Sequence, residues 1–466
     1  MDSIKWDKEV DALVVGSGAG GMSAALTASV EGLDVLLVEK TGHIGGSTAI
    51  SGGALWIPLN AQTDAAGHPD SFDKVWTYLQ ETVGAAASDD MKRAYLQAGP
   101  RMMDDLVERG FLQVAARTAS PDYYPDRPGA ALGGRSLDPV EFDGRKLGRH
   151  FKTLRDPLKE FTVLGGMMVN ITDVRHLLRA TRAFTSWRHA MKLVLRYYTD
   201  RLRGYHRGTR LLLGNALAAQ LFHALLSRNI PYWLDTPALG LVRGDDGAVL
   251  GVTVMRQGRQ MSIRARRGVV LATGGFPWDS ARRQQAYPHP TGDWSMSPRD
   301  NTGDGIRMAE GAGAALGQGH CSPAFWAPVS ILEQPGRAPL HYPHLVWDRA
   351  KPGLIAVNGA GRRFVNESTS YHAFVEAMYR SHADTPTVPA YLLCDQRFID
   401  TWGLGLALPG GRPRQHLIDA GYLLQAPTLQ ALAQKLGVPA DALAATVQRY
   451  NPVSYTHLRA HETRED

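Results

Sequence analysis

A glycine-rich stretch near the N-terminus has residue types and a spacing that can bind a dinucleotide. Gly16, Gly18 and Gly21 form the pattern G-x-G-x-x-G, and Glu39 follows 18 residues after Gly21. The first glycine permits a tight turn, the second lets backbone approach a pyrophosphate, and the third lets a helix pack close to a strand. The carboxylate accepts hydrogen bonds from a ribose 2′-hydroxyl. This spacing predicts a pyrophosphate and ribose site.

Three elements must position these residues. The short β-branched run at 12–15 predicts a buried parallel strand, and the alanine-rich stretch at 20–31 predicts a helix. The N-terminus of that helix would point its amide groups at a phosphate. A second strand is expected at 35–38, with Glu39 at its end. The order is that of a Rossmann-like fold.

A second glycine cluster, GGSTAISGG at 45–53, follows directly. It resembles the flavoproteins of the fumarate reductase and succinate dehydrogenase superfamily, in which this run wraps FAD; the alternative is an ordinary loop between strands. The resemblance implies FAD as cofactor. The residues it assigns to the cofactor here are Gly16, Gly18, Ala19, Gly20, Gly21, Glu39, Lys40, Gly45, Gly46, Ser47, Thr48, Ser51, Gly52 and Gly53.

Two later stretches extend the same resemblance. RGVVLATGGF at 267–276 is similar to the second flavin-domain signature, a strand ending beside the cofactor, which implies Thr273 and Gly274 as cofactor residues. NTGDG at 301–305 is similar to a motif whose aspartate, here Asp304, lies near the flavin. Asp304 could equally favour the positive end of the helix that starts there, and both roles are compatible.

The stretch RFVNESTSY at 363–371 ends in Tyr371. In soluble fumarate reductases the similar stretch ends in an arginine that delivers a proton to the substrate. A phenol removes the positive charge that a dicarboxylate requires, which argues against fumarate. Tyrosine at this position resembles the FAD-dependent 3-ketosteroid dehydrogenases (3-oxosteroid 1-dehydrogenases), and the resemblance covers nearly the whole chain from 11 to 451.

That resemblance implies 1,2-desaturation of ring A of a 3-ketosteroid, with a proton passing to a tyrosine base and a hydride to flavin N5. It implies Tyr371 as the base and Tyr123 as the hydroxyl that supports it, with Tyr124 as second choice. A phenol with a pKa of about 10 is a poor base unless neighbours stabilise the phenolate. The alternatives are a half-buried structural Tyr371 and loop tyrosines in surface contacts.

The family also uses a Y-P-G-G/A-G stretch and a G-L-Y-A-A-G-N stretch near the C-terminus, and the sequence contains neither. Residues 453–466 resemble a non-native run. We therefore expect a C-terminally truncated chain in which activity is weak or absent.

Composition places the chain among ordinary globular proteins. It has 466 residues, 44% hydrophobic and 21% charged, and two cysteines, which provide neither a disulfide framework nor a metal site. No signal peptide and no 18-residue apolar run stand out. We expect a cytoplasmic protein without a metal ion.

A basic segment carries much of the net charge of +6. Between 175 and 210 there are ten Arg or Lys residues and one acid, Asp200. The segment is either a solvated helical face packed on the body or a membrane-surface helix with Trp187, Leu193 and Leu195 on its apolar face. No recognition fold accompanies it, so we expect no nucleic-acid partner.

The expected fold is α/β: a discontinuous Rossmann-like FAD-binding domain, its C-terminal part missing, with an inserted α+β substrate domain. We place the FAD domain at 1–280, with a basic helical insertion at about 151–210, the catalytic domain at 281–452 and a tail at 453–466. The substrate is expected to be an apolar, steroid-like ketone, and the electron acceptor is not specified. Alternatives are a related flavoenzyme acting on a C=C or CH–CH bond (a 4-ene steroid dehydrogenase or an enoate reductase), or an inactive flavoprotein fragment.

Overall fold

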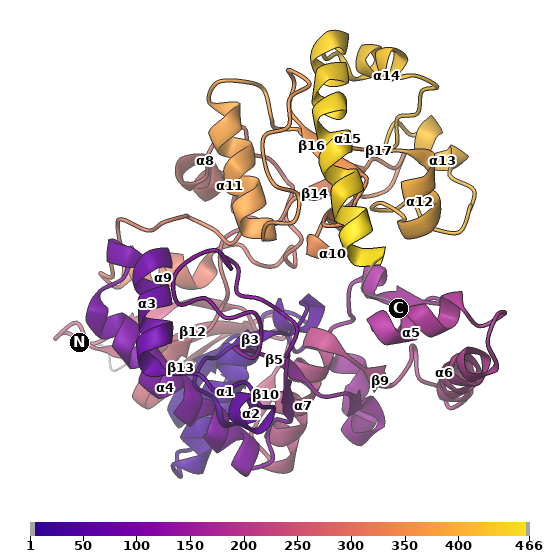
Figure 1. Cartoon of the computed structure of the whole chain (residues 1–466). Coiled ribbons are helices and arrows are strands. Elements are labelled where there is room, and N and C mark those ends of the chain that lie inside the picture. Colours follow the sequence, from indigo (N-terminus) through magenta and orange to yellow (C-terminus); the bar gives the residue numbers. More distant parts are fainter. Residues whose placement is uncertain (1–4, 463–466) are drawn as a thin grey trace. The chain divides into compact units, whose positions relative to one another are not determined.

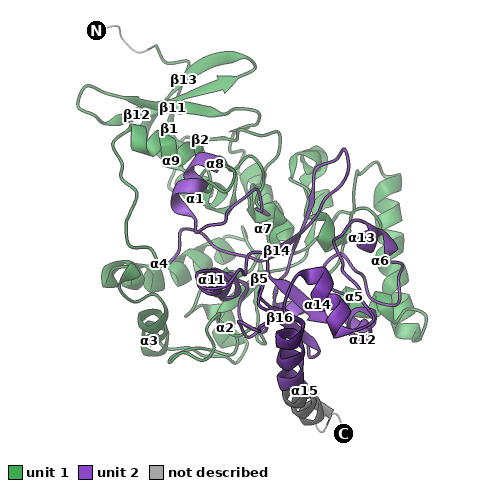
Figure 2. Ribbon diagram, turned by 90° about the horizontal axis from the view of Figure 1, so that it is seen from above, with its two compact units in different colours: residues 1–279, 297–321 green, residues 280–296, 322–466 purple. Residues whose placement is uncertain are grey.

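The computed structural model describes residues 5–462 of the chain. They pack into two compact units, coloured separately in Figure 2. Unit 1 comprises residues 1–279 and 297–321, and unit 2 comprises residues 280–296 and 322–466. The functional boundary predicted at residue 280 stays a prediction. By packing, residues 297–321, which include Asp304, belong to unit 1.

Unit 1 is built on a six-stranded sheet in the order β10-β2-β1-β13-β12-β11. Parallel pairing joins β1 to β2 and β13, and β2 to β10, whereas β11, β12 and β13 form an antiparallel meander. The elements of this sheet are β1 (Lys8–Val15), β2 (Val35–Val38), β10 (Tyr232–Trp233), β11 (Ala238–Arg243), β12 (Val249–Arg256) and β13 (Arg259–Leu271).

Side chains of the two central strands alternate between two hydrophobic cores, as the period of a strand requires. Val14 of β1 and Leu37 of β2 lie in the core beneath helices α1 (Ala19–Val30) and α7 (Leu213–Ser227). Leu13 and Leu36 lie in the core formed with the meander. Because both faces are covered, β2 and the second half of β1, residues 12–15, are apolar and buried throughout.

The rest of unit 1 is mostly helical, with short ribbons (Figure 1). Its remaining elements are β3 (Leu55–Trp56), α2 (Ala61–Ala65), α3 (Phe72–Thr82), α4 (Asp89–Glu108), β4 (Val114–Ala116), β5 (Ser136–Pro139), β6 (Phe142–Asp143), β7 (Thr162–Val163), β8 (Met167–Met168), α5 (Ile171–Leu178), α6 (Phe184–Leu202), β9 (Arg210–Leu211) and α9 (Asp304–Gly311). None of the helices within residues 5–462 combines the length and the apolar character that a bilayer crossing requires.

The basic segment forms the helices α5 and α6. The expected apolar face was partly wrong, because Leu193 is buried against Met167 and Tyr197, while Trp187 and Leu195 are exposed. Leu193 lies three residues after Ala190 and four before Tyr197, so it shares their inward face.

Unit 2 is α+β, with two separate two-stranded sheets, β14-β15 and β16-β17. Leu354, Phe398 and Leu417 are among the residues that form one of its cores, and Val357, Ala433 and Leu443 are among those of another. Its elements are α8 (Ser280–Ala286), β14 (Val329–Leu332), β15 (Leu340–Pro343), α10 (Val346–Arg349), β16 (Leu354–Val357), α11 (Tyr371–His382), β17 (Tyr391–Cys394), α12 (Gln396–Trp402), α13 (Gln415–Asp419), α14 (Leu429–Leu436) and α15 (Ala440–Glu462). Of the expected non-native tail, 463–466 lie outside the described residues, and its origin stays a prediction.

Candidate active site

The first glycine turn depends on close backbone contacts that exclude a side chain. Gly16 has φ of +105°, and a Cβ placed there would lie 2.3 Å from the carbonyl oxygen of Ala272 at the end of β13. A Cβ on Gly21 would lie 1.9 Å from the carbonyl oxygen of Gly16. Both glycines are therefore needed for α1 to start directly beside β1 and β13.

A cavity of about 240 Å³ opens at the carboxyl ends of β1 and β2. Twelve of the residues assigned to the cofactor from the sequence line it: Gly16, Gly18, Ala19, Gly20, Glu39, Lys40, Gly46, Ser47, Thr48, Thr273, Gly274 and Asp304. Gly21, Gly45, Ser51, Gly52 and Gly53 do not line it. The structure thus brings together three segments that are far apart in the sequence.

Gly18 and Gly20 leave room for a ligand. A Cβ on Gly18 would have only the Thr48 hydroxyl within 4 Å, at 3.7 Å, and a Cβ on Gly20 would meet nothing within 4 Å. The N-terminus of α1 begins here, and beyond the Ala19 amide, which donates to the Thr48 hydroxyl, its first-turn amides favour an anion. This open, positively polarised end fits the pyrophosphate of a dinucleotide.

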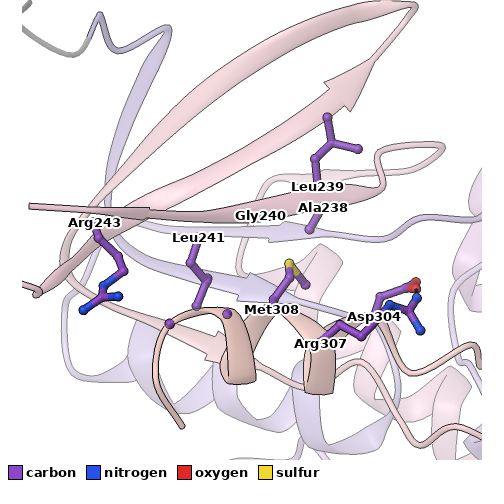
Figure 3. A pocket seen from close by; sticks show the side chains of 10 residues that line it. Ala238, Leu239, Gly240, Leu241, Arg243, Asp304, Arg307 and Met308 are labelled. Carbon is purple, nitrogen blue, oxygen red and sulfur yellow. Dashed lines mark hydrogen bonds and ion pairs between the residues drawn. The ribbon is translucent and has the colours of Figure 1, made fainter. Parts of the chain in front are cut away.

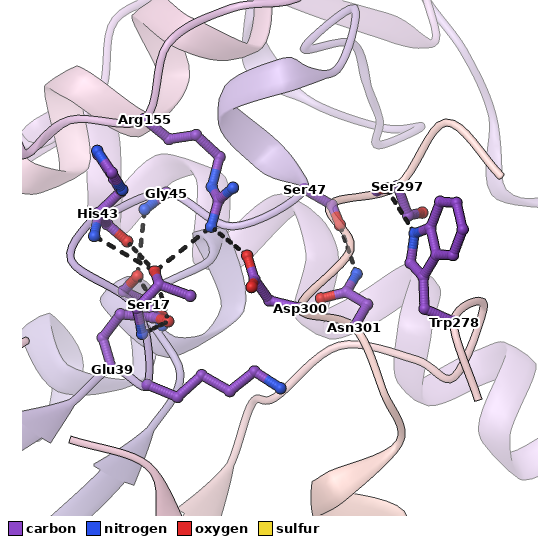
Figure 4. A network of polar contacts seen from close by, with 12 residues as sticks. Ser17, Glu39, His43, Gly45, Ser47, Arg155, Trp278, Ser297, Asp300 and Asn301 are labelled. Atoms are coloured by element: carbon purple, nitrogen blue, oxygen red, sulfur yellow. Dashed lines mark hydrogen bonds and ion pairs between the residues drawn. The ribbon is translucent and has the colours of Figure 1, made fainter. Parts of the chain in front are cut away.

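Glu39 ends β2 and is held by four protein hydrogen bonds (Figure 4). The Ser17 amide and hydroxyl donate to Oε2 at 3.0 and 2.6 Å, and those of Thr41 donate to Oε1 at 3.0 and 3.1 Å. An ionised carboxylate offers about four acceptor sites in all, and only 8% of Glu39 is exposed. Its orientation is fixed before any ribose hydroxyl arrives.

The second glycine cluster folds back against the first. The Gly45 amide donates to the Ser17 carbonyl at 3.1 Å, and the Thr48 hydroxyl accepts from the Ala19 amide at 3.0 Å. A Cβ on Gly53 would lie 2.5 Å from the Gly214 amide nitrogen of α7. Gly53 is thus required for helix packing, and a direct contact with the cofactor stays a prediction.

Lys40 and Asp304 form an ion pair across the cavity. Lys40 Nζ lies 2.7 Å from Asp304 Oδ2 and 3.0 Å from the Thr302 hydroxyl. Burial by itself would raise the pKa of Asp304, but the hydrogen bonds from Lys40 and Thr302 outweigh it and lower that pKa. Asp304 is also the first residue of α9, so both roles considered from the sequence are compatible with its position.

Ten residues that line the cavity were not found from the sequence as site residues, among them Arg155, Asp300 and Asn301. Arg155 lies 3.0 Å from Asp300 Oδ2, and Asn301 donates to the Ser47 hydroxyl at 2.8 Å (Figure 4). Asn301 stands in the NTGDG motif, so the motif could have included it. Arg155 belongs to no motif, because its position depends on a contact with Asp300, 145 residues away in the sequence.

A larger hollow of about 430 Å³ lies between β11 and α9 (Figure 3). Leu239, Leu241, Arg243 and Arg307 line it, and it shares Asp304 with the smaller cavity. It has none of the residues of the two N-terminal glycine turns that approach a phosphate. The smaller cavity is therefore the candidate cofactor site. Within the part of the chain that the structure describes, no cluster of His, Cys, Asp or Glu could hold a metal ion.

The loop that contains Pro121, Asp122 and Tyr123, called here the P-D-Y loop, is held by a buried ion-pair cluster. Arg135 is 2% exposed and lies 2.7 Å from both Asp70 Oδ2 and Asp122 Oδ2. Asp122 also accepts from the Trp56 indole at 2.8 Å and the Ala131 amide at 2.9 Å. Its neighbour Tyr123, a predicted site residue, is 39% exposed. The loop thus presents an exposed phenol from a fixed backbone.

Tyr124, the second choice, is held differently. Its amide donates to the Tyr78 hydroxyl at 3.3 Å, and burial raises the pKa of Tyr78 to about 12. Tyr78 therefore stays a neutral acceptor for this amide at neutral pH.

Tyr371 is the first residue of α11 in unit 2, and Arg349 holds the stretch that precedes it. The buried Arg349 donates to the carbonyls of Glu367 at 2.7 Å and of Thr369 at 3.3 Å. Ser370 caps the helix by accepting from the Ala373 amide. The predicted base thus sits on a helix start whose approach is anchored by a buried arginine. Tyr123 belongs to unit 1, whereas Tyr371 belongs to unit 2.

Comparison with known proteins identifies the family. A family model described as FAD binding domain matches residues 11–464. The 3-oxosteroid 1-dehydrogenase of Mycobacterium tuberculosis is 37% identical over 95% of this chain and 78% of its own length. The 4-oxocyclohex-2-ene-1-carboxylate 5-dehydrogenase of Sinomonas cyclohexanicum is 35% identical over 96% of this chain and 76% of its own length.

Solved structures agree. The 3-ketosteroid delta1-dehydrogenase of Sterolibacterium denitrificans matches with a TM-score of 0.82 and 37% identity, over 95% of this chain and 78% of that one. A flavocytochrome c3 fumarate reductase shares the fold, with a TM-score of 0.54 and 19% identity over 96% of this chain and 62% of that one. The predicted α/β fold and family are confirmed: the chain belongs to the FAD-binding family of the 3-ketosteroid dehydrogenases.

Proposed function

We propose that the protein is an FAD-dependent dehydrogenase that introduces a 1,2-double bond into ring A of a 3-ketosteroid. The observation that carries the proposal is the 37% identity, over 95% of the chain, to a 3-ketosteroid delta1-dehydrogenase whose structure contains 1,4-androstadiene-3,17-dione. Tyr371, in place of the arginine of fumarate reductases, supports a neutral ketone as substrate.

FAD fits the candidate site. Gly18 and Gly20 leave the α1 N-terminus open to the pyrophosphate, and Glu39, held by the Ser17 and Thr41 donors, lines the same cavity. Thr273, Gly274 and Asp304 line the same cavity. When bound, FAD supplies the acceptor for the hydride that leaves the substrate.

The protein's own part in the reaction is a proton transfer. A C–H bond beside the ring ketone is acidified because the charge delocalises onto the carbonyl oxygen as an enolate. Tyr371 acts as the phenolate, whose oxygen takes this proton and becomes a neutral hydroxyl, and the Tyr123 hydroxyl supports it. Tyr371 occupies the first position of α11.

A spectroscopic experiment tests the proposal. Purified protein loaded with FAD should show the visible flavin band, and anaerobic 4-androstene-3,17-dione should bleach it while succinate does not. Loaded protein that is bleached by succinate and not by the steroid would overturn the assignment.

A second candidate substrate is a 4-oxocyclohexene carboxylate, since a dehydrogenase of that class is 35% identical over 96% of the chain. Both substrates lose hydrogens beside a ring ketone, so the same base would serve. Bleaching by 4-oxocyclohex-2-ene-1-carboxylate at concentrations where androstenedione is inert would favour this candidate.

A further inference from the structure

One face of helix α6 is buried against other elements of unit 1. Ala190, Leu193 and Tyr197 are buried, and Leu193 and Tyr197 pack with Met167. The Tyr197 hydroxyl donates to the Leu164 carbonyl at 2.8 Å. This inward face fixes α6 to α5 and to the ribbon β7-β8, and Figure 1 shows the two helices at the edge of unit 1, away from its central sheet.

The same helix carries a second apolar stripe that faces outward. Its members recur at spacings of three and four, which places them on one side of a helix. They run the length of α6: Phe184, Trp187, Met191, Leu195, Tyr198 and Leu202. Met191 is half-buried, and the others are between 48% and 89% exposed. We call these six residues the outer stripe. A contiguous exposed apolar face of this kind marks an interaction site.

The unpaired, exposed charges of the segment at 175–210 are all positive, whereas Arg196 of α6 is paired with Glu141 and Asp143. Six exposed cations of the segment make no ion pair or side-chain hydrogen bond within the described residues: Arg175, Arg179, Arg182, Arg188, Lys192 and Arg203. The acids are turned inward, since Asp173 and Asp200 are each 1% exposed. Asp173 holds Arg210 and His189, and Asp200 accepts from Thr209.

We propose that α6 lies on an anionic lipid bilayer, with the outer stripe at the acyl boundary and the flanking cations at the headgroups. An apolar stripe with aromatic residues, bordered by Arg and Lys, has the composition of an interfacial helix. At about 1.5 Å per residue the 19 residues of α6 extend about 28 Å along the surface.

Charge selects this occupant over a second copy of the chain. Two outer stripes brought together would face cation against cation, because the segment exposes no acid between 175 and 210. Anionic headgroups instead attract the basic residues near the surface. The inference goes beyond the proposed activity and does not depend on it.

Vesicle co-sedimentation of the full chain tests the proposal. The protein should bind vesicles of phosphatidylcholine mixed with phosphatidylglycerol, and should bind pure phosphatidylcholine at least tenfold more weakly. Binding should weaken as NaCl rises, because salt screens the headgroup charge. Equal binding to both vesicle types, or none to the anionic ones, would overturn the proposal.

Two double variants test whether vesicle binding depends on the outer stripe or on exposed apolar side chains in general. Trp187→Ser with Leu195→Ser should reduce binding to anionic vesicles by about tenfold or more, since each side chain loses apolar burial. The matched control is Trp402→Ser with Leu408→Ser, because those residues are 51% and 56% exposed against 48% and 59%. The control should bind as the parent does, and an equal loss in both variants contradicts the proposal.

A charge variant and a solution measurement complete the test. Arg188→Gln with Lys192→Gln should weaken anionic binding by about tenfold while changing the weak binding to phosphatidylcholine little. Sedimentation velocity in the absence of lipid should show no dimer that depends on the stripe. A dimer abolished by the Trp187 and Leu195 changes, without vesicle binding, would assign the stripe to a second copy and overturn the proposal. Flavin content and circular dichroism confirm that each variant is folded.

Discussion

Tyr371 and Tyr379 occupy the same helix but have different prospects for chemistry. Tyr379 is tied to the Pro290 carbonyl at 3.1 Å, and burial raises its pKa. Tyr371 stands at the helix start, at the end of a stretch anchored by Arg349. The two tyrosines therefore provide a matched pair for testing the proposed base.

Tyr371→Phe should lower kcat for the ketone by about 10²–10⁴-fold, the usual contribution of a general base. Flavin content should not change, because the residue lies outside the cofactor cavity. Tyr379→Phe removes one hydrogen bond and should cost about 1 kcal/mol of stability with kcat retained. Steady-state kinetics on both variants decides the matter, and a full rate in Tyr371→Phe would remove this residue as the base.

Asp304→Asn should destabilise the protein in a pH-dependent manner. The pKa of Asp304 is lowered in the folded state from 3.8, so its ionised form contributes stability above pH 3.8. That contribution is lost as the pH falls through the depressed pKa. The difference in urea midpoint between parent and variant should therefore stay constant from neutral pH to about 4 and shrink below 3.8.

The control for this prediction is Asp64→Asn. Asp64 stands in the first turn of α2 and makes no ion pair within the described residues. Its midpoint difference should be small, because no ion pair is lost. A pH-independent difference for Asp304→Asn would contradict a role for the Lys40 pair.

Site residues were predictable from the sequence where a motif is local. The spacing of Gly16, Gly18 and Gly21 encodes a turn whose geometry only glycine satisfies, so it could be read directly. Arg155 could not be read, because its contact with Asp300 joins positions 145 residues apart and no local pattern marks either side chain. Asn301 stands inside the NTGDG motif but was not predicted as a site residue, because its role is set by the Ser47 hydroxyl across the cavity.

Two adjacent glycines at the start of α1, Gly20 and Gly21, should respond differently to substitution by alanine. Gly21→Ala should disrupt the β1–α1 turn, because its Cβ would lie 1.9 Å from the Gly16 carbonyl oxygen. Gly20→Ala meets nothing within 4 Å and lies inside the helix, so it should stabilise the apoprotein by about 0.5–1 kcal/mol. Thermal unfolding without FAD measures both. Similar melting temperatures for the two variants would show that the close approach is not rigid.

The Arg135 cluster ties the P-D-Y loop to unit 1. Arg135→Ala leaves Asp70 and Asp122 buried without their cation and should cost about 3–5 kcal/mol. Arg117→Ala is the control, since its partner Asp138 and Arg117 itself are 39% and 32% exposed, and such pairs contribute about 1 kcal/mol or less. Chemical denaturation distinguishes them. Equal losses would mean that burial does not set the strength of the cluster.

Helices and strands with a strong period were predicted well, and those made by long-range pairing were not. The expected helix at 20–31 is α1. By contrast, β11 was not anticipated, because its pairing with β12 and its packing by α9 are tertiary. The strand β5, which pairs with β3 and β4, is too short to show a period in the sequence.

At the scale of the whole molecule, the cofactor residues and the proposed base belong to different packing units. The glycine turns, the strand end at Thr273 and the helix start at Asp304 all belong to unit 1, although they span most of its sequence. Tyr371 belongs to unit 2, whose cores are separate. Binding of FAD should therefore stabilise unit 1 directly, whatever its effect on catalysis.

Hydrogen exchange with and without FAD should reveal this division. A ligand at 100 times its dissociation constant stabilises the state that binds it by about 2.7 kcal/mol, so amides around Gly18, Thr48 and Thr273 should exchange more slowly. The strands β16 and β17, which form a core of unit 2 with α14, should exchange at an unchanged rate. Gly18→Val provides the control: its backbone is extended, with φ of −68°, so the chain should still fold, but the side chain occupies the pyrophosphate position. Protection that persists in Gly18→Val, or that is as large in β16 and β17 as at the glycine turns, would place the cofactor elsewhere.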